Sequence, residues 1–411
     1  MESISLSDRE ILRNLARRKR DYAVNAQNEQ ILQKWQALAR GERKAPTVRL
    51  LFSNFTREVV LSRMRCVGET ARGLEAELLS SMVGRELFDD DTPLSPTFEV
   101  ALQTHAQPFG AQAKRTRIEG SIGFHIEPVT DDIEADFEKF TGGFFGIDKE
   151  GTQAKCALAD DVFGDILPSR VVMFNLTGAM TNPLVGLIGL ENYYLSMMDA
   201  PDTLHKIMDM ACSLYEKYYD ELEKTQSLLP TVGISPISQE SFAFTDELPS
   251  DGVKSTRQVW GFLEAQETTA ASPKAYGEFV YPYMDRLARR YGLLSYGCCE
   301  RVDNLWEDYL SKWPNLRKLS VSPFNDAAKI GEYLRGSRVI FYSKPRAEHV
   351  TNPGPLDEEF IRKYFKKLAE DASGCILEVA QREVGTIYGD FERGRRYVEL
   401  AKQTLDRYWK P

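Results

Sequence analysis

Short apolar runs alternate with amphipathic stretches along most of the chain. Stretches such as 190–224 and 355–372 have the spacing of apolar residues that is typical of helices. The runs that indicate strands are 49–53, 97–102, 169–175, 230–235, 293–297, 316–322, 338–343 and 374–380. Parallel strands joined by helical crossovers produce this alternation. Eight runs favour an α/β fold of the (β/α)8 type, a TIM barrel, over an open sheet.

The N-terminal part is different because its pattern is mainly helical. Helical spacing covers 7–41 and again 56–85, and the first strand candidate lies between these two stretches. We therefore predict an N-terminal helical extension over 1–45 and a barrel domain over 46–411. A last helix is expected over about 390–409, close to the end of the chain.

Composition narrows the class of protein. The chain has 411 residues and carries 52 Lys and Arg against 61 Asp and Glu, a net charge of −9. An acidic chain has no general attraction for nucleic acid or for an anionic membrane. No apolar stretch approaches the roughly 18–20 residues that span a bilayer, and the start lacks the apolar core of a secretory signal. We expect a cytoplasmic protein that binds neither nucleic acid nor membranes.

Two adjacent cysteines, Cys298 and Cys299, follow the fifth run and precede Glu300. In a barrel the reacting groups lie at the C-terminal ends of the strands, so this position faces the catalytic mouth. A cytoplasmic thiol is normally reduced, which argues against a structural disulfide. The alternative interpretation is that the cysteines are small buried hydrophobic residues.

Carboxylates come from the segment before the fifth run. Ser272 and Pro273 predict the start of a helix, Pro282 should kink it, and Glu278 is expected near the mouth. Alternatively, Glu278 is an exposed carboxylate that favours the helix dipole. The segment 236–271 is interpreted as a long loop that covers the mouth. It supplies the further candidates Trp260, Glu264, Gln266 and Glu267.

Thiolates and carboxylates together suit zinc, which accepts both sulfur and oxygen. The four histidines have no metal-ligand spacing, although His105 follows the second run and is a candidate for lining the site. No Ser-His-Asp nucleophile elbow and no glycine-rich nucleotide loop is present in the sequence.

Four stretches resemble the uroporphyrinogen decarboxylase superfamily. They are 272–300 (SPKAYGEFVYPYMDRLARRYGLLSYGCCE), 313–334, 339–345 (VIFYSKP) and 385–403. The resemblance covers most of the chain and is firmer after about residue 165. It implies a (β/α)8 barrel with one of two chemistries: decarboxylation of uroporphyrinogen without metal, or methyl transfer through zinc to or from a corrinoid protein or onto a thiol. The Arg-rich R-Q-A-G-R motif of the decarboxylase branch is absent from this sequence.

The methyltransferase branch often has H-x-C at the end of the fifth strand, where this chain has Tyr296 and Cys298. Relatives that demethylate aryl methyl ethers bind zinc through two glutamates and a histidine, with the second glutamate about twenty residues before the third ligand. Glu278 stands 20 positions before Cys298, and Glu264 another 14 before Glu278. The resemblance thus implies a zinc shell drawn from Glu264, Glu278, Cys298 and Cys299.

Our first hypothesis is a zinc-dependent methyltransferase that demethylates a small methyl ether or methylated amine. The methyl group would pass to cobalamin on a separate corrinoid protein. Expected catalytic residues are Glu278, Cys298 and Tyr296, expected substrate-binding residues are Trp260, His105 and Gln266, and a homodimer is expected. The second hypothesis is a metal-free lyase that holds a carboxylated substrate through Lys344 and Arg346. The third is a binding protein that kept the barrel without catalysis.

Overall fold

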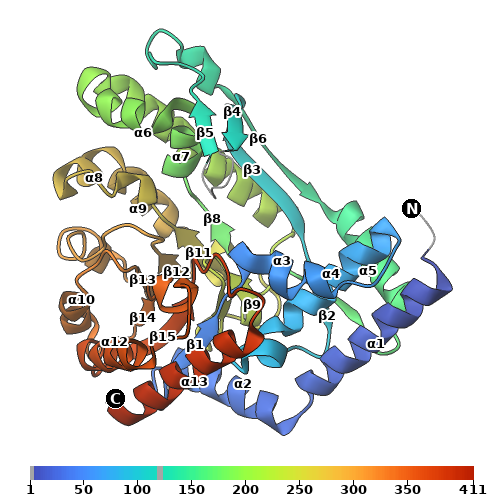
Figure 1. Ribbon diagram of the computed structural model, residues 1–411. Coiled ribbons are helices and arrows are strands. Elements are labelled where there is room, and N and C mark those ends of the chain that lie inside the picture. The colour runs from blue at the N-terminus through green and yellow to red at the C-terminus, as the bar shows by residue number, and fades with distance from the viewer. Residues whose placement is uncertain (1–3, 118–123) are drawn as a thin grey trace.

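The computed structural model describes residues 4–117 and 124–411 (Figure 1). Its centre is a seven-stranded sheet in which all neighbouring strands run parallel. The order is β1 (Thr47–Leu50), β15 (Ile376–Gln381), β14 (Ile340–Ser343), β13 (Leu316–Val321), β12 (Leu293–Tyr296), β11 (Trp260–Leu263) and β8 (Leu176–Thr177). The first strand therefore pairs with the last, as the (β/α)8 prediction requires.

One further parallel pair lies next to the seven-stranded sheet along the chain. Strand β7 (Ser169–Val172), which directly precedes β8 in the chain, pairs in parallel with β2 (Phe98–Ala101). Within the described residues no strand pairing joins β1 to β2. Loop residues lie at this edge instead: the N–H groups of Val48 and Leu50 donate to the carboxylates of Asp91 (2.8 Å) and Asp90 (3.1 Å). The strand order and direction agree with a barrel, and strand pairing does not close it at this edge.

The prediction of a wall strand over 230–235, the fourth run, is wrong. Residues 230–235 do not form a wall strand, because β9 (Gly233–Ile237) pairs antiparallel with β10 (Ser241–Ala243) in a separate hairpin. Gly233 has a positive φ and Pro236 lacks an N–H, so this run is poorly suited to a central parallel strand. The wall position belongs to β11, which lies inside the segment that was expected to be a loop.

The β9–β10 hairpin packs against the inner face of the sheet. The Ser241 hydroxyl donates to the carboxylate of Glu378 on β15 (2.6 Å), and the Lys318 amine on β13 donates to the Ser241 hydroxyl (2.5 Å). Outward-facing residues of the same strands, such as Phe341 and Leu377, belong instead to the large core shared with the helices. The hairpin thus fills space on the side of the sheet opposite the helices.

Helices surround this sheet (Figure 1). The N-terminal pair is α1 (Leu6–Ala23) and α2 (Ala26–Ala39), so the helical stretch expected over 7–41 divides at Asn25, whose side chain caps α2. The others are α3 (Thr56–Val59), α4 (Glu69–Val83), α5 (Lys149–Phe163), α6 (Thr181–Asp199), α7 (Pro201–Lys224), α8 (Pro273–Phe279), α9 (Tyr281–Ala288), α10 (Ala327–Leu334), α11 (Glu348–Thr351), α12 (Glu358–Asp371) and α13 (Phe391–Tyr408). The helix containing Pro282 is broken at Val280, which separates α8 from α9. The division into 1–45 and 46–411 stays a prediction.

An antiparallel arm follows β2 in the chain. It consists of β3 (Gln103–Phe109) paired with β6 (Gly142–Asp148), and of β4 (Lys114–Arg117) paired with β5 (Phe124–Glu127). The arm lies beside α6 and α7 in Figure 1. Across the described residues, every helix is too short or too polar to traverse a lipid bilayer.

Candidate functional site

The carboxyl ends of three wall strands bring reactive side chains together. Cys298, Cys299 and Glu300 follow β12, Glu264 follows β11, and Lys344 follows β14. All are buried except Cys299, which is partly exposed. The position of the cysteines at the C-terminal end of the fifth wall strand agrees with the sequence-based expectation for a barrel mouth.

Gly297 turns the chain at this point. Its φ of 99° lies in the left-handed region that favours glycine, and a Cβ there would lie 3.2 Å from the Cβ of Ser320. The following segment is held by hydroxyls of the next strand and its loop. Ser320 donates to the Cys298 carbonyl (3.1 Å), and Ser322 donates to the Cys299 carbonyl (2.9 Å). The backbone that carries the two thiols is therefore fixed.

Glu300 joins the loops after β11 and β12. One carboxylate oxygen accepts the N–H of Cys298 (2.6 Å), and the other accepts the N–H of Ala265 (2.9 Å). Burial raises the pKa of Glu300, while these backbone donors lower it. Because both oxygens accept backbone hydrogen bonds, we interpret Glu300 as a positioning residue of the mouth.

The two thiols differ in character although they are adjacent. Their Sγ atoms lie 3.6 Å apart and both cysteines are free. The pKa of Cys299 falls to about 7, first because the Cys298 thiol donates to its sulfur and also because the Lys344 amine is near. The same hydrogen bond and burial raise the pKa of Cys298. A large share of Cys299 is therefore thiolate near neutral pH, while Cys298 stays a thiol.

The pKa of Glu264 is shifted in the opposite direction from that of Cys299. Burial raises its pKa well above the usual range, and the neighbouring carboxylates Glu267 and Glu300 raise it further. One of its oxygens accepts the N–H of Gln266 at 3.0 Å. Glu264 therefore carries a proton at a pH where an ordinary carboxyl group has lost it.

Lys344 supplies the positive charge of the site. Its amine donates to the Cys298 carbonyl (3.1 Å) and to the side-chain oxygen of Gln239 (2.8 Å), which stands at the tip of the β9–β10 hairpin. Burial lowers the pKa of Lys344 to about 8. Within the described part of the chain, this amine has no carboxylate in direct ion-pair contact. Its charge remains available to the nearby thiolate.

The structure places the other predicted site residues elsewhere. Glu278 is exposed on α8, and Tyr296 points into the helix layer, where its hydroxyl bonds that of Tyr276 at 2.9 Å. Trp260 is buried at the start of β11 among residues of the hairpin. His105 lies exposed on β3 of the arm, beside Phe144. Of the predicted set, only Glu264, Gln266, Cys298 and Cys299 lie around the mouth.

The donor set does not fit a preformed zinc centre. Across residues 4–117 and 124–411, no group of three or more His, Cys, Asp and Glu side chains is placed to hold a metal ion. Glu278 is exposed on α8, and Glu300 uses both oxygens for backbone hydrogen bonds. Zinc stays a prediction of the sequence resemblance.

From the sequence, Glu300 has no predicted role beyond being the residue after the cysteines. Lys344 is predicted at the mouth, but only as a substrate-holding residue of the lyase hypothesis. Both have a detectable signal, since Lys344 directly follows the end of a strand run and Glu300 comes shortly after one, at the face where a barrel carries its chemistry. The role of Gln239 has no such signal, because it depends on the hairpin packing inside the sheet.

Comparison with known proteins adds evidence on the fold. No family model matches the chain, and no curated protein matches it. Among solved structures, a methyltransferase from Methanosarcina mazei is similar with a TM-score of 0.52 and 13% sequence identity, over 92% of this chain and 98% of the other. At this low sequence identity, the structural similarity shows a shared fold and nothing about activity. The mixed α/β architecture therefore extends over nearly the whole length of both chains.

Proposed function

We propose that this protein is a methyltransferase of the demethylating kind. Glu264 would be its general acid, and the Cys299 thiolate would stabilise the methyl group in transfer. The observation that carries the proposal is the geometry of the mouth, where the Glu300 carboxylate joins the loop of Glu264 after β11 to the loop of the cysteine pair after β12. Burial raises the pKa of Glu264 there, and the hydrogen bond from Cys298 lowers the pKa of Cys299 to about 7. Oppositely shifted groups at the C-terminal face of such a sheet are typical of catalytic sites. The fold shared with a methyltransferase and the sequence resemblance support the same class.

Glu264 would act on the leaving group. As the methyl group departs, the bond between carbon and the donor's oxygen or nitrogen breaks with its electron pair on that heteroatom. Glu264 gives its proton to this atom, so the product leaves as a neutral alcohol or amine and Glu264 becomes a carboxylate. The acceptor supplies the electron pair of the new bond to the methyl carbon. A positioned acid of this kind accelerates such a step by roughly 10²–10⁴-fold.

Cys299 would act on the methyl group itself. A methyl group in transfer carries partial positive charge, which a fixed thiolate nearby stabilises. The Cys298 thiol and Lys344 keep Cys299 ionised, and the Ser320 and Ser322 hydroxyls hold its backbone in place. Each of these residues therefore has a role that the geometry supports without a metal step.

The acceptor that we propose is cobalamin on a separate corrinoid protein, which follows from the sequence resemblance. The test uses purified protein, free cob(I)alamin and a panel of donors: methoxybenzoate, trimethylamine and methanol. Formation of methylcobalamin is followed by absorbance. We expect transfer from at least one donor and a loss of roughly 10²–10⁴-fold in Glu264→Gln. Glu278→Gln, an exposed carboxylate with the same change, is the matched control.

Two results would count against the proposal. One is a panel in which no donor loses its methyl group. The other is a Glu264→Gln variant that transfers the methyl group at the rate of the unmodified protein, since Glu264 would then supply no proton. Metal analysis of the same samples decides whether zinc binds, and Cys298→Ser with Cys299→Ser tests whether the thiols hold it.

A second candidate function has one observation in its favour. The cationic side chains of Arg49, Lys344 and Arg382 all contact the turn formed by Gln239 and Glu240. A substrate carboxylate that replaced the Gln239 amide oxygen would meet Lys344 and Arg382, as a metal-free lyase requires. Arg346, the other predicted residue, is exposed and does not belong to this group. Release of carbon dioxide from a carboxylated substrate, lost in Arg382→Met, would favour the lyase.

A further inference from the structure

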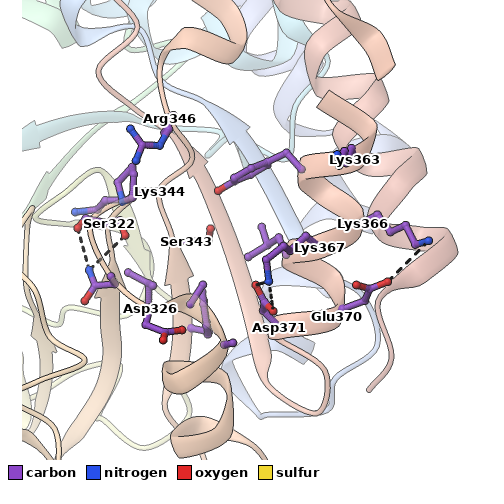
Figure 2. Close-up of a pocket in the computed structure, with 18 of the residues that line it drawn as sticks. Ser322, Asp326, Ser343, Lys344, Arg346, Lys363, Lys366, Lys367, Glu370 and Asp371 are labelled. Atoms are coloured by element: carbon purple, nitrogen blue, oxygen red, sulfur yellow. Dashed lines mark hydrogen bonds and ion pairs between the residues drawn. The ribbon is translucent and has the colours of Figure 1, made fainter. Parts of the chain in front are cut away.

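A groove separate from the barrel mouth lies between α10 and α12 (Figure 2). Its volume is about 700 Å³, within the range of small-molecule sites. It is bordered by the segments that follow β13 and β14 and by one face of α12. The groove lies on the helix side of the sheet, whereas the hairpin fills the opposite side.

Part of the groove's lining is apolar. Val321, Phe341, Leu368 and the ring of Phe360 line it. Phe360 is 52% exposed, which is high for a phenylalanine at the edge of a concave surface. Removing such a ring and its neighbours from water favours a ligand with an apolar body.

The ends of the groove carry different charges. Figure 2 shows Lys344, Arg346 and Lys363 toward one end, with Asp326, Glu370 and Asp371 toward the other. The acidic end is largely compensated. Lys367 pairs with Asp371 at 2.9 Å, Lys366 approaches Glu370 at 4.0 Å, and Asp326 accepts the N–H of Lys329 to cap α10.

The basic end is not compensated. Arg346 and Lys363 are exposed, and neither has an ion-pair partner among the described residues. They come from two different elements, the loop after β14 and helix α12, and both border the groove. An anionic group between them would gain two charge-assisted contacts, one of which Arg can make with two parallel N–H groups.

We propose that this groove binds an amphiphilic anion, with an aryl or acyl body between α10 and α12 and a carboxylate or phosphate head held by Arg346 and Lys363. The site is distinct from the mouth and does not rest on the proposed methyl transfer. It does share a wall with the mouth. Ser322 and Lys344, which border the groove, donate to the carbonyls of Cys299 and Cys298. A ligand there lies against the same segments that hold the thiols.

The test uses the full chain and anilinonaphthalene sulfonate, a fluorescent probe with an apolar body and an anionic head. We expect saturable binding that octanoate or octyl phosphate displaces, and the stronger of the two identifies the preferred head group. Arg346→Glu with Lys363→Glu should weaken probe binding by about tenfold or more. The matched control is Lys206→Glu with Lys274→Glu, two exposed lysines on α7 and α8 with the same charge change, which should bind as the unmodified protein does.

A second variant tests the cavity. Ala328 borders the groove and is exposed, so Ala328→Phe fills the space without disturbing the core and should abolish probe binding. Near-ultraviolet circular dichroism checks the fold of each variant. Undiminished probe binding in Arg346→Glu with Lys363→Glu overturns the proposal. Displacement by octylamine as effective as that by octanoate also overturns it, because the site would then not select an anion.

Discussion

Two buried lysines lie within or directly after neighbouring strands of the same sheet, and their surroundings differ. Lys318 on β13 is 1% exposed and pairs at 2.8 Å with Glu378, itself 1% exposed, with Ser241 completing the cluster. Lys344, after β14, is buried against a backbone carbonyl and the Gln239 amide oxygen. Burial lowers the pKa of both lysines, but Glu378 opposes this effect at Lys318.

The difference separates a structural cluster from a reactive one. At Lys318 every charge has a direct counterion, so nothing remains to shift a neighbouring group. At Lys344 the positive charge has no direct carboxylate partner among the described residues, and it contributes to the ionisation of Cys299. We therefore expect substitutions near Lys318 to change stability and substitutions at the mouth to change reactivity.

The largest expected effect is at Glu378. Glu378→Gln keeps the shape of the side chain but leaves the buried Lys318 ammonium without a counterion, which costs about 3–5 kcal/mol of unfolding free energy. Urea unfolding measures this loss. The control is Asp161→Asn, whose ion pair with Arg9 is exposed and should contribute less than about 1 kcal/mol. Equal losses in the two variants would show that the Lys318 cluster is not a closed structural unit.

The next effect is a gain of stability in Glu264→Gln. The folded pKa of Glu264 is raised, so between its ordinary pKa near 4.5 and the raised value the folded state holds a proton that the unfolded state has released. Stability of the unmodified protein therefore falls as pH rises through this window, by up to about 1.4 kcal/mol per pH unit. The amide variant should lack this fall and be the more stable form at neutral pH. If the curves of unfolding free energy against pH ran parallel for the two proteins, the pKa of Glu264 would not be raised in the folded state.

A smaller effect on stability, with a clear effect on reactivity, is expected for Lys344→Met. Without the buried charge, the pKa of Cys299 should rise from about 7 toward the ordinary value near 8.5. The rate of alkylation by iodoacetamide at pH 7 then falls severalfold. Lys363→Met, an exposed lysine on α12, is the control and should leave the rate unchanged. Equal rates for Lys344→Met and the unmodified protein would show that this amine does not support the thiolate.

The smallest effect is expected for Glu278→Gln. The side chain is exposed on α8, away from the thiols, so unfolding free energy should change by less than about 0.5 kcal/mol. Methyl transfer to cob(I)alamin should also be unchanged. A loss of transfer as large as that of Glu264→Gln would restore the original prediction that Glu278 belongs to the site.

Most of the fold could be predicted because wall strands and helices have different periods. Seven of the eight expected runs fall on wall strands. A wall strand that no expected run covers is β11, which lies inside the segment interpreted as a loop. The run at 230–235 has the right composition for a strand, but Gly233 and Pro236 direct it into a hairpin instead. Composition alone does not distinguish these outcomes.

The site was predictable where it depends on strand ends, and not where it depends on side-chain direction. Cys298 and Glu264 both follow a strand, so their place at the mouth follows from topology. Tyr296 is still inside β12, where alternation turns it toward the helices. The left-handed turn at Gly297 then resets the alternation before Cys298. Spacing likewise places Glu278 on α8 without specifying the face of the helix.

Ionisation of Cys299 is central to the proposed site, and the pH dependence of its alkylation measures this ionisation directly. Iodoacetamide is added to the folded protein from pH 5.5 to 10, and the labelled peptide is quantified by mass spectrometry, with Cys298→Ala used to assign the signal to Cys299. We predict a rate that rises with pH around a midpoint near 7, because deprotonation creates the nucleophile. A midpoint at 8.5 or above in the unmodified protein would contradict the claim that the barrel mouth holds a thiolate.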